Sequence, residues 1–256
     1  MGKNVRRCIV PTRHPTPAPM RCLPRLLATV VALLVLGGCA ASSPLTGLPG
    51  PPSELPAAYV FSIYDAAVFE ASEVQPLPSI TDDTLTVVSW ISARYAGSYP
   101  VGVDTTYAFE IWVTVAPQVQ DACRGFDQDP DALRLRLQQY LGLPPSDGDR
   151  VFGTFRVARA DLFRACTDPS LETTACSETV PPGVSDAHMA WVAGQMLGSY
   201  TVAPTAAGTG YPWTRMGYTY DWNPASPEVG AYEYVIAPGG ALRVLDIAPT
   251  SAYCAR

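Results

Sequence analysis

Short apolar runs, separated by polar segments rich in glycine and proline, dominate the chain beyond residue 56. The runs are rich in Val, Ile, Thr and aromatic residues, which are the types enriched in β-strands. They predict strands at residues 57–64, 84–95, 106–116, 150–158, 215–222, 231–237 and 241–247. No internal repeat and no regular strand–helix alternation connects them, so we expect an α+β fold with a mainly antiparallel sheet.

The segment 108–115 has the clearest alternation of apolar and polar positions. One set of alternate positions holds Phe109, Ile111, Val113 and Val115, and the other holds Glu110, Trp112 and Thr114. Because successive side chains of a strand point to opposite faces, we expect one buried face and one partly wet face. The last two predicted strands flank Pro238-Gly239-Gly240, a turn sequence that predicts a hairpin.

Two stretches show the spacing of helices. In the first, Asp129 is a capping residue, Pro130 occupies the first turn, and apolar residues recur until Gly142. In the second, Ser185 is the expected cap, and the apolar positions are Met189, Val192, Ala193, Met196 and Leu197. A shorter helical turn is expected at 117–123. We therefore predict a single globular domain at 57–256 with two principal helices.

The stretch GYPWTRMGYTYDW, residues 210–222, holds five aromatic side chains in thirteen positions. If its second half is a strand, Met216, Tyr218, Tyr220 and Trp222 share one face. Two interpretations are open. The aromatic face packs in the core, or its rings, with the flanking Tyr211 and Trp213, stack on the sugars of an envelope glycan. The candidate ligand-binding residues of the second interpretation are Arg215, Tyr218, Tyr220 and Trp222.

The N-terminus has the layout of an export signal. Six basic residues precede residue 26, and the run LLATVVALLVL follows at 26–36. Eleven apolar residues are short of the ~20 that span a bilayer, but they match the apolar region of a signal peptide. We therefore predict a signal peptide at 1–38, with Met20 as an alternative start.

The apolar run ends in Leu36-Gly37-Gly38-Cys39, which resembles the lipobox of bacterial lipoproteins. The resemblance implies that the thiol of Cys39 receives a diacylglyceryl group and that the leader is cut before it, which gives stable anchoring in a membrane. Ala40 follows Cys39, and in a Gram-negative host this favours the outer membrane. Residues 39–56 contain five prolines and predict an extended tether. The expected location is the cell envelope, facing the periplasm or the cell surface.

The charges exclude one class of partner. Six of the 17 basic residues and none of the 23 acidic residues precede residue 26, so the domain has eleven basic residues, all arginine, against every acidic one. A surface this acidic repels phosphate backbones, and we expect no nucleic-acid partner.

The cysteines fit an oxidising compartment. Without the leader and Cys39, Cys123, Cys166, Cys176 and Cys254 remain, and four cysteines allow three pairings. We favour Cys166–Cys176, which closes a polar loop, and Cys123–Cys254, which ties down the C-terminus. A zinc site is not expected, because no C-x-x-C pair occurs and His188 is the sole histidine after the leader.

Catalytic signatures are scarce. No G-x-S-x-G, H-E-x-x-H, P-loop or G-x-G-x-x-G motif occurs, and His188 is interpreted as a surface or half-buried residue and not as a catalytic base. Asp127, Asp129 and Asp131 begin like a calcium loop, but Ala132 and Gln138 stand where that loop needs Gly and Glu. Helix capping explains these acids better, so no metal or other cofactor is expected.

One local resemblance points to an enzyme. The sequence from Tyr232 to Gly240, YEYVIAPGG, followed by LRVL, looks like the C-terminal hairpin of ADP-ribosyltransferases. The resemblance implies that Glu233 stabilises the nicotinamide ribose of NAD and that Arg94 grips its phosphates. Our first expectation remains a non-catalytic binding module on the envelope, with a polysaccharide or protein partner. The NAD-using enzyme is the alternative.

Overall fold

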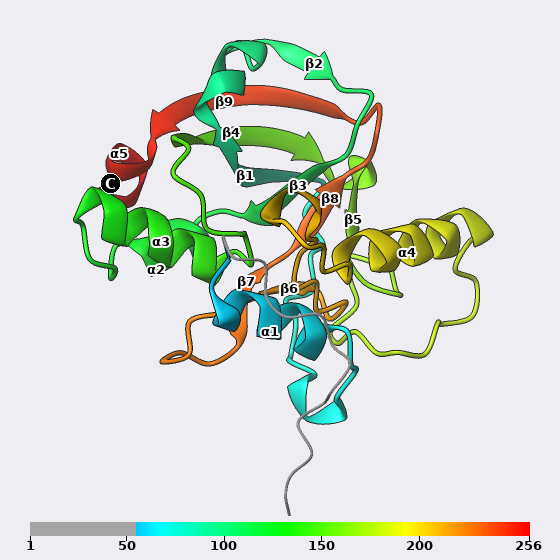
Figure 1. Ribbon diagram of the computed structural model, residues 1–256. Coiled ribbons are helices and arrows are strands. Elements are labelled where there is room, and N and C mark those ends of the chain that lie inside the picture. Colours follow the sequence, from blue (N-terminus) through cyan, green and yellow to red (C-terminus); the bar gives the residue numbers. More distant parts are fainter. Residues whose placement is uncertain (1–54) are drawn as a thin grey trace, which may run out of the picture. The chain divides into compact units, whose positions relative to one another are not determined.

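The computed structural model describes residues 55–256, which belong to one compact unit (Figure 1). The predicted signal peptide, Cys39 and nearly all of the tether lie outside the described residues. Seven strands form one sheet, in the order β2-β9-β4-β1-β3-β8-β5, and all its pairings are antiparallel. They are β1 (Thr84–Ser92), β2 (Asp104–Thr106), β3 (Ile111–Val115), β4 (Arg150–Ala158), β5 (Leu162–Arg164), β8 (Tyr234–Ile236) and β9 (Ala241–Pro249).

Five α-helices and a second, two-stranded sheet complete the described part of the chain. The helices are α1 (Ala57–Ala66), α2 (Gln118–Cys123), α3 (Pro130–Tyr140), α4 (Asp186–Ser199) and α5 (Thr250–Cys254), and the small sheet pairs β6 (Tyr218–Tyr220) with β7 (Val229–Tyr232). In Figure 1, α2, α3 and α5 gather at one side of the large sheet, and α4 lies apart from them. The predicted α+β fold with a mainly antiparallel sheet is confirmed.

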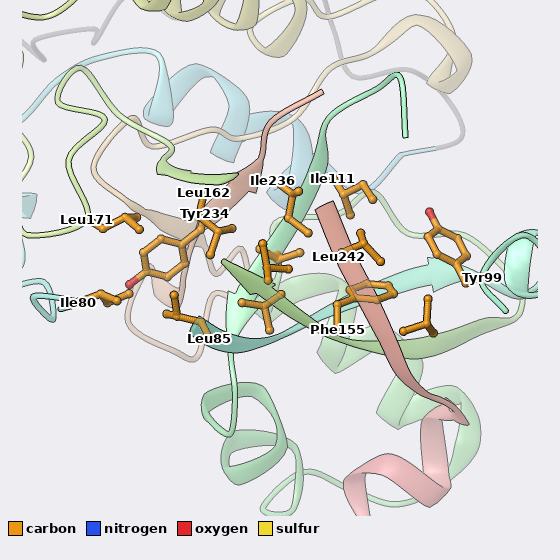
Figure 2. Close-up of a cluster of buried hydrophobic side chains, with 14 residues drawn as sticks. Ile80, Leu85, Tyr99, Ile111, Phe155, Leu162, Leu171, Tyr234, Ile236 and Leu242 are labelled. Atoms are coloured by element: carbon orange, nitrogen blue, oxygen red, sulfur yellow. The ribbon is translucent and has the colours of Figure 1, made fainter. Parts of the chain in front are cut away.

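The larger hydrophobic core covers one face of the sheet (Figure 2). It collects side chains from most strands of the sheet and from loops that cover them, among them Leu85, Ile111, Phe155, Leu162, Tyr234, Ile236 and Leu242. On the opposite face, Val88, Trp90 and Phe152 form a second core with residues of α2, α3 and α5. The central strands are therefore buried on both faces.

The two predicted helices are found with their predicted caps. The Asp129 carboxylate accepts hydrogen bonds from the backbone N–H groups of Asp131 and Ala132 at the start of α3. The Ser185 hydroxyl accepts one from the N–H of His188 at the start of α4. These bonds satisfy donors that the first helical turn leaves free. Asp129 thus caps the helix, as the sequence predicted, whereas Asp127 accepts from the N–H of Asp129 and Asp131 forms an ion pair with Arg134.

The prediction of a strand at 57–64 is wrong, because this segment lies within α1. Its β-branched and aromatic residues favour a strand locally, but Tyr59, Val60, Ile63 and Ala66 recur at helical spacing and are buried. They pack against Tyr220 and other core residues. Burial on one helical face therefore overrides the local propensity.

The predicted hairpin across Pro238-Gly239-Gly240 is also wrong. The turn itself forms, since the N–H of Gly240 donates to the carbonyl of Ala237 at 2.9 Å. However, β8 pairs with β3 and β5, whereas β9 pairs with β4 and β2. Both edges of each strand are occupied by distant segments, so the turn carries the chain from one part of the sheet to another.

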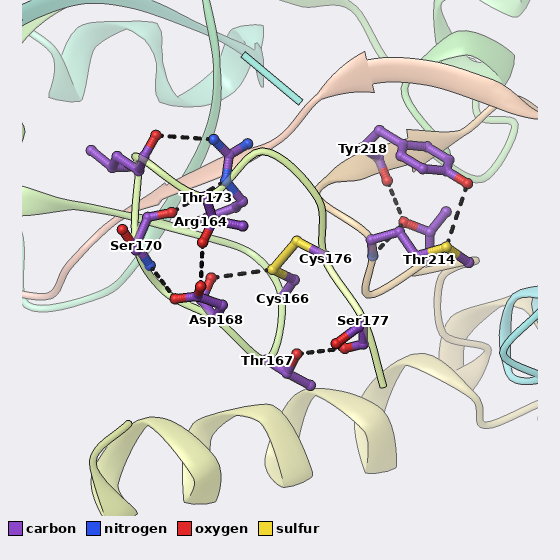
Figure 3. Close-up of a disulfide and its surroundings, with 12 residues drawn as sticks. Arg164, Cys166, Thr167, Asp168, Ser170, Thr173, Cys176, Ser177, Thr214 and Tyr218 are labelled. Atoms are coloured by element: carbon purple, nitrogen blue, oxygen red, sulfur yellow. Dashed lines mark hydrogen bonds between the residues drawn. A yellow bond between two sulfur atoms is a disulfide. The ribbon is translucent and has the colours of Figure 1, made fainter. Parts of the chain in front are cut away.

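The cysteines form the favoured pairs. Cys123–Cys254 joins α2 to α5 across a sequence separation of 131 residues, and Cys166–Cys176 closes a loop with a separation of ten. The small loop also has internal hydrogen bonds, such as that from the backbone N–H of Ser170 to Asp168 Oδ1 at 3.0 Å (Figure 3). The prediction of a disulfide-stabilised domain is confirmed.

Candidate functional site

The aromatic residues predicted to bind a ligand are buried. Only Tyr218–Tyr220 of the predicted strand 215–222 is a strand, and Tyr218, Tyr220 and Trp222 are each no more than 5% exposed. Their polar tips have internal partners: the hydroxyl of Tyr218 donates to the carbonyl of Glu73, that of Tyr220 to the carboxylate of Asp65, and the indole of Trp222 to the carbonyl of Leu143. These positions match the core interpretation of the segment.

Arg215, the fourth predicted residue, is buried as well. Its backbone has a φ of 61°, which is uncommon for a residue other than glycine. Its guanidinium lies over the ring of Tyr200 at 5.6 Å, and its Nη2 donates to the carbonyl of Ala67 at 3.1 Å. Arg215 therefore joins α1 to the segment after α4 and does not face solvent.

A cavity of about 630 Å³ lies beside this segment. Its walls come from β1, β3, the loop at 141–143, one side of α4, residues 211–213 and Glu233. The volume lies within the roughly 300–1,000 Å³ range of small-ligand sites in proteins. Of the predicted residues, Tyr220, Glu233 and Arg94 line it, and Arg215, Tyr218 and Trp222 do not.

Exposed aromatic rings line the cavity. Tyr95, Phe109 and Tyr211 are 50%, 54% and 50% exposed, and all three belong to its wall. The guanidinium of Arg94 lies over the ring of Tyr95 at 4.5 Å. Large aromatic side chains are costly to leave in water, and several around one cavity suit a ligand with flat apolar faces.

A tryptophan cluster, Trp112, Trp191 and Trp213, forms the adjoining wall. Its ring centroids are 5.7–6.2 Å apart, and two of the rings, Trp112 and Trp213, line the cavity. The carboxylate of Glu110 accepts hydrogen bonds from the indoles of Trp112 and Trp191 and from Gln195. The cluster is thereby fixed in place, and the face of β3 that was predicted to be partly wet faces the cavity.

Three residues that line the cavity each have a buried polar atom without a hydrogen-bond partner: Thr114 Oγ1, Trp213 Nε1 and Glu233 Oε2. We call these residues the inner triad. Unpartnered buried polar groups cost about 1–3 kcal/mol each and are rare in native proteins. The pairing of Val113 with Tyr234 places Thr114 and Glu233 at adjacent ends of β3 and β8. Three such atoms in one cavity mark it as the candidate site.

The carboxyl group of Glu233, one of the inner triad, has an unusual protonation state. Burial raises the pKa of Glu233 to about 8, and the indole N–H of Trp213 acts in the opposite direction. The indole is thus close to the carboxyl group, although no hydrogen bond of normal geometry joins them. At neutral pH the side chain of Glu233 is mostly a neutral acid, which donates one hydrogen bond and accepts others.

Trp213 differs from the other tryptophans, all five of which lie in the described part of the chain. The indole N–H groups of Trp90, Trp112, Trp191 and Trp222 each donate to a protein oxygen at 2.6–3.2 Å. Buried indoles usually find such a partner. The N–H of Trp213 makes no such bond, and its side chain lines the cavity close to the carboxyl group of Glu233.

A separate acidic cluster lies at the C-terminal end of α1. Carboxylate oxygens of Asp65, Glu73 and Glu228 lie within 4.8 Å of one another, next to a small pocket of about 150 Å³. Burial and the neighbouring carboxylates raise the pKa of Glu73 to about 7. Acids in this arrangement can share protons or attract a cation, and the hydroxyl of Tyr220 already donates to Asp65.

His188 has a structural position, as predicted. Its Nε2 lies 2.8 Å from the carbonyl oxygen of Cys166, and its ring stacks on Trp191 with centroids 5.4 Å apart. It therefore links α4 to the loop closed by Cys166–Cys176. The sequence did not single out Thr114 as a site residue, and it named Trp213 only as a flanking ring of the aromatic stretch. Their proximity to Glu233 depends on the meeting of β3, β8 and the 211–213 segment.

Comparisons with known proteins identify no relative. No family model, no curated protein and no solved structure matches the chain. Within residues 55–256, no helix combines the length and the apolar character needed to cross a bilayer.

Proposed function

We propose that this protein is a lipid-anchored lipoprotein of the cell envelope, and that its cavity binds a glycan of that envelope without cleaving it. The inner triad carries the proposal, because buried polar atoms without partners in a ligand-sized cavity are best explained by groups that a ligand satisfies. The exposed rings of Tyr95, Phe109 and Tyr211 suit the flat faces of sugars.

A glycan fits this site better than a protein partner. Protein partners bind across broad surfaces of about 800 Å² on each side, whereas this site is a concave cavity with polar groups inside it. Sugars combine apolar faces with many hydroxyl and amide groups. The tryptophan cluster and the inner triad offer partners for both kinds of group.

The location rests on Leu36-Gly37-Gly38-Cys39 and on the two disulfides, which form and persist in oxidising compartments. We propose the outer membrane, with the domain facing the periplasm or the cell surface. A Cys39→Ser variant should lose labelling by radioactive palmitate and leave the membrane fraction. Unchanged labelling of that variant would contradict the anchor.

A Tyr211→Ala variant should bind soluble peptidoglycan fragments roughly tenfold more weakly than the parent, because a ring that stacks on a sugar contributes about 1 kcal/mol or more. Isothermal titration calorimetry of the full-length protein measures the loss. Phe61→Ala is the matched control, since Phe61 is an exposed aromatic residue of α1, 62% exposed, that does not line the cavity. Equal losses in both variants would contradict the site.

One observation supports the alternative function, an NAD-using enzyme: Glu233 and Arg94 line the same cavity. The hairpin on which the resemblance to ADP-ribosyltransferases rested is not formed, because β8 and β9 are not neighbours. If this alternative holds, the parent turns over NAD and a Glu233→Gln variant does not. No turnover by the parent would reject it.

A further inference from the structure

The inner triad can select one chemical group of the glycan, and this inference rests on the proposed function. Trp213 Nε1 is a hydrogen-bond donor only, whereas the Thr114 hydroxyl can both donate and accept. Glu233 in its neutral form also does both. A group that satisfies all three must therefore present at least one strong acceptor oxygen, and a donor beside it uses the accepting capacity of Thr114 and Glu233 as well.

Apolar side chains border the same end of the cavity. Val88 pairs directly with Thr114 across β1 and β3, and both Val88 and Val119 line the cavity while being at most 2% exposed. The side chains of these two valines offer no hydrogen-bonding atom to a ligand. The group that reaches this end therefore needs a small apolar part beside its donor and its acceptor.

We propose that the inner triad binds the acetamido group of an N-acetylated amino sugar, which makes Thr114, Trp213 and Glu233 specificity-determining residues. The carbonyl oxygen of such a group accepts from the indole of Trp213 and from the acid of Glu233. Its N–H donates to Thr114 Oγ1 or to the carbonyl oxygen of Glu233. Its methyl group packs against Val88 and Val119.

A sugar with a plain hydroxyl in place of the acetamido group satisfies this end of the cavity less well. It has no carbonyl oxygen and no methyl group, so it leaves buried atoms of the triad unpaired and an apolar volume unfilled. Sites built to hydrogen-bond a buried group discriminate strongly against analogues that lack it. We expect the full-length protein to prefer the acetamido form by at least tenfold.

The test compares two soluble ligands. The full-length, oxidised protein in detergent micelles is titrated by calorimetry with the β-1,4-linked trisaccharide of N-acetylglucosamine and with the matching trisaccharide of glucose. The parent should bind the first at least tenfold more tightly. Glu233→Gln, which keeps a donor and an acceptor in the same shape, should retain most of this preference.

Glu233→Leu and Thr114→Val remove polar atoms of the triad with little change of side-chain size. Each should lose most of the preference for the acetamido form, because the buried polar atom that selects this group is gone. Circular dichroism shows whether each variant folds. If one of them does not, the other still tests the inference.

The outcomes separate the inference from the proposed function. Equal affinity of the parent for both trisaccharides, or a preference that Glu233→Leu and Thr114→Val leave intact, overturns the acetamido assignment and leaves glycan binding in place. If the parent binds neither these trisaccharides nor peptidoglycan fragments, the proposed function fails and the inference fails with it.

Discussion

Removal of the Cys123–Cys254 disulfide by a double Cys→Ala substitution is expected to lower the free energy of unfolding by about 5 kcal/mol, because it frees a long loop in the unfolded chain. This bridge spans 131 residues and joins α2 to α5, the helices that cover the second core. Urea unfolding of the oxidised, full-length protein measures the change.

The Cys166–Cys176 pair is the internal control for this prediction. Its sequence separation is ten residues, so the same loop-closure argument gives about 3 kcal/mol for its removal. Both pairs are almost fully buried, and alanine leaves a similar small void at each. A larger loss for the short loop than for the long one would contradict the account of the disulfides.

Raising the pH from 5 to 8 is expected to destabilise the protein, with Glu233 contributing up to about 4 kcal/mol. Burial raises the pKa of this carboxyl to about 8, so the folded state keeps its proton over a range in which the unfolded chain releases it. The folded state binds more protons between pH ~4.5 and pH 8, and its stability therefore falls as the pH rises through this range.

Glu73 contributes with the same sign over a lower range, because burial and the carboxylates of Asp65, Glu228 and Glu70 raise its pKa to about 7. Tyr200, which interacts with Glu233, has a pKa raised by burial to about 12 and does not titrate in this range. The two acids are separable with glutamine variants. Glu73→Gln should flatten the curve only below about pH 7, whereas Glu233→Gln should flatten it up to about pH 8. A parent-like slope above pH 7 in Glu233→Gln would contradict the burial of this acid.

Local patterns predicted the elements whose structure is decided locally. The predicted strand 150–158 coincides with β4, because its apolar residues alternate and both of its neighbours are long strands. The starts of α3 and α4 were predicted from Asp129 and Ser185, since a capping side chain acts within three residues of its own position.

Non-local contacts decided what the patterns missed. The segment 57–64 looks like a strand by composition but becomes a helix because its buried side packs against Tyr220 and Trp222. The Pro-Gly-Gly turn suggests a hairpin, but distant strands occupy the edges of β8 and β9. Local sequence does not encode such competition between segments.

The candidate site was predicted only in part for the same reason. Glu233 was singled out through a resemblance, and the alternation around Trp112 predicted a face that is partly wet. Their meeting with Trp213 in one cavity depends on how β3, β8 and the 211–213 segment pack. The aromatic side chains of 218–222, which drew attention first, stabilise the core beside that cavity.

The most direct test of glycan binding in the cavity is the ¹H–¹⁵N spectrum of the tryptophan indoles during titration with the N-acetylglucosamine trisaccharide. The signal of Trp213, assigned with a Trp213→Phe variant, should shift downfield and saturate as its unpartnered N–H gains an acceptor. The signal of Trp222, which does not itself line the cavity and whose indole already donates to the carbonyl of Leu143, should stay in place. A Trp213 signal that does not move at saturating ligand would contradict the proposed site.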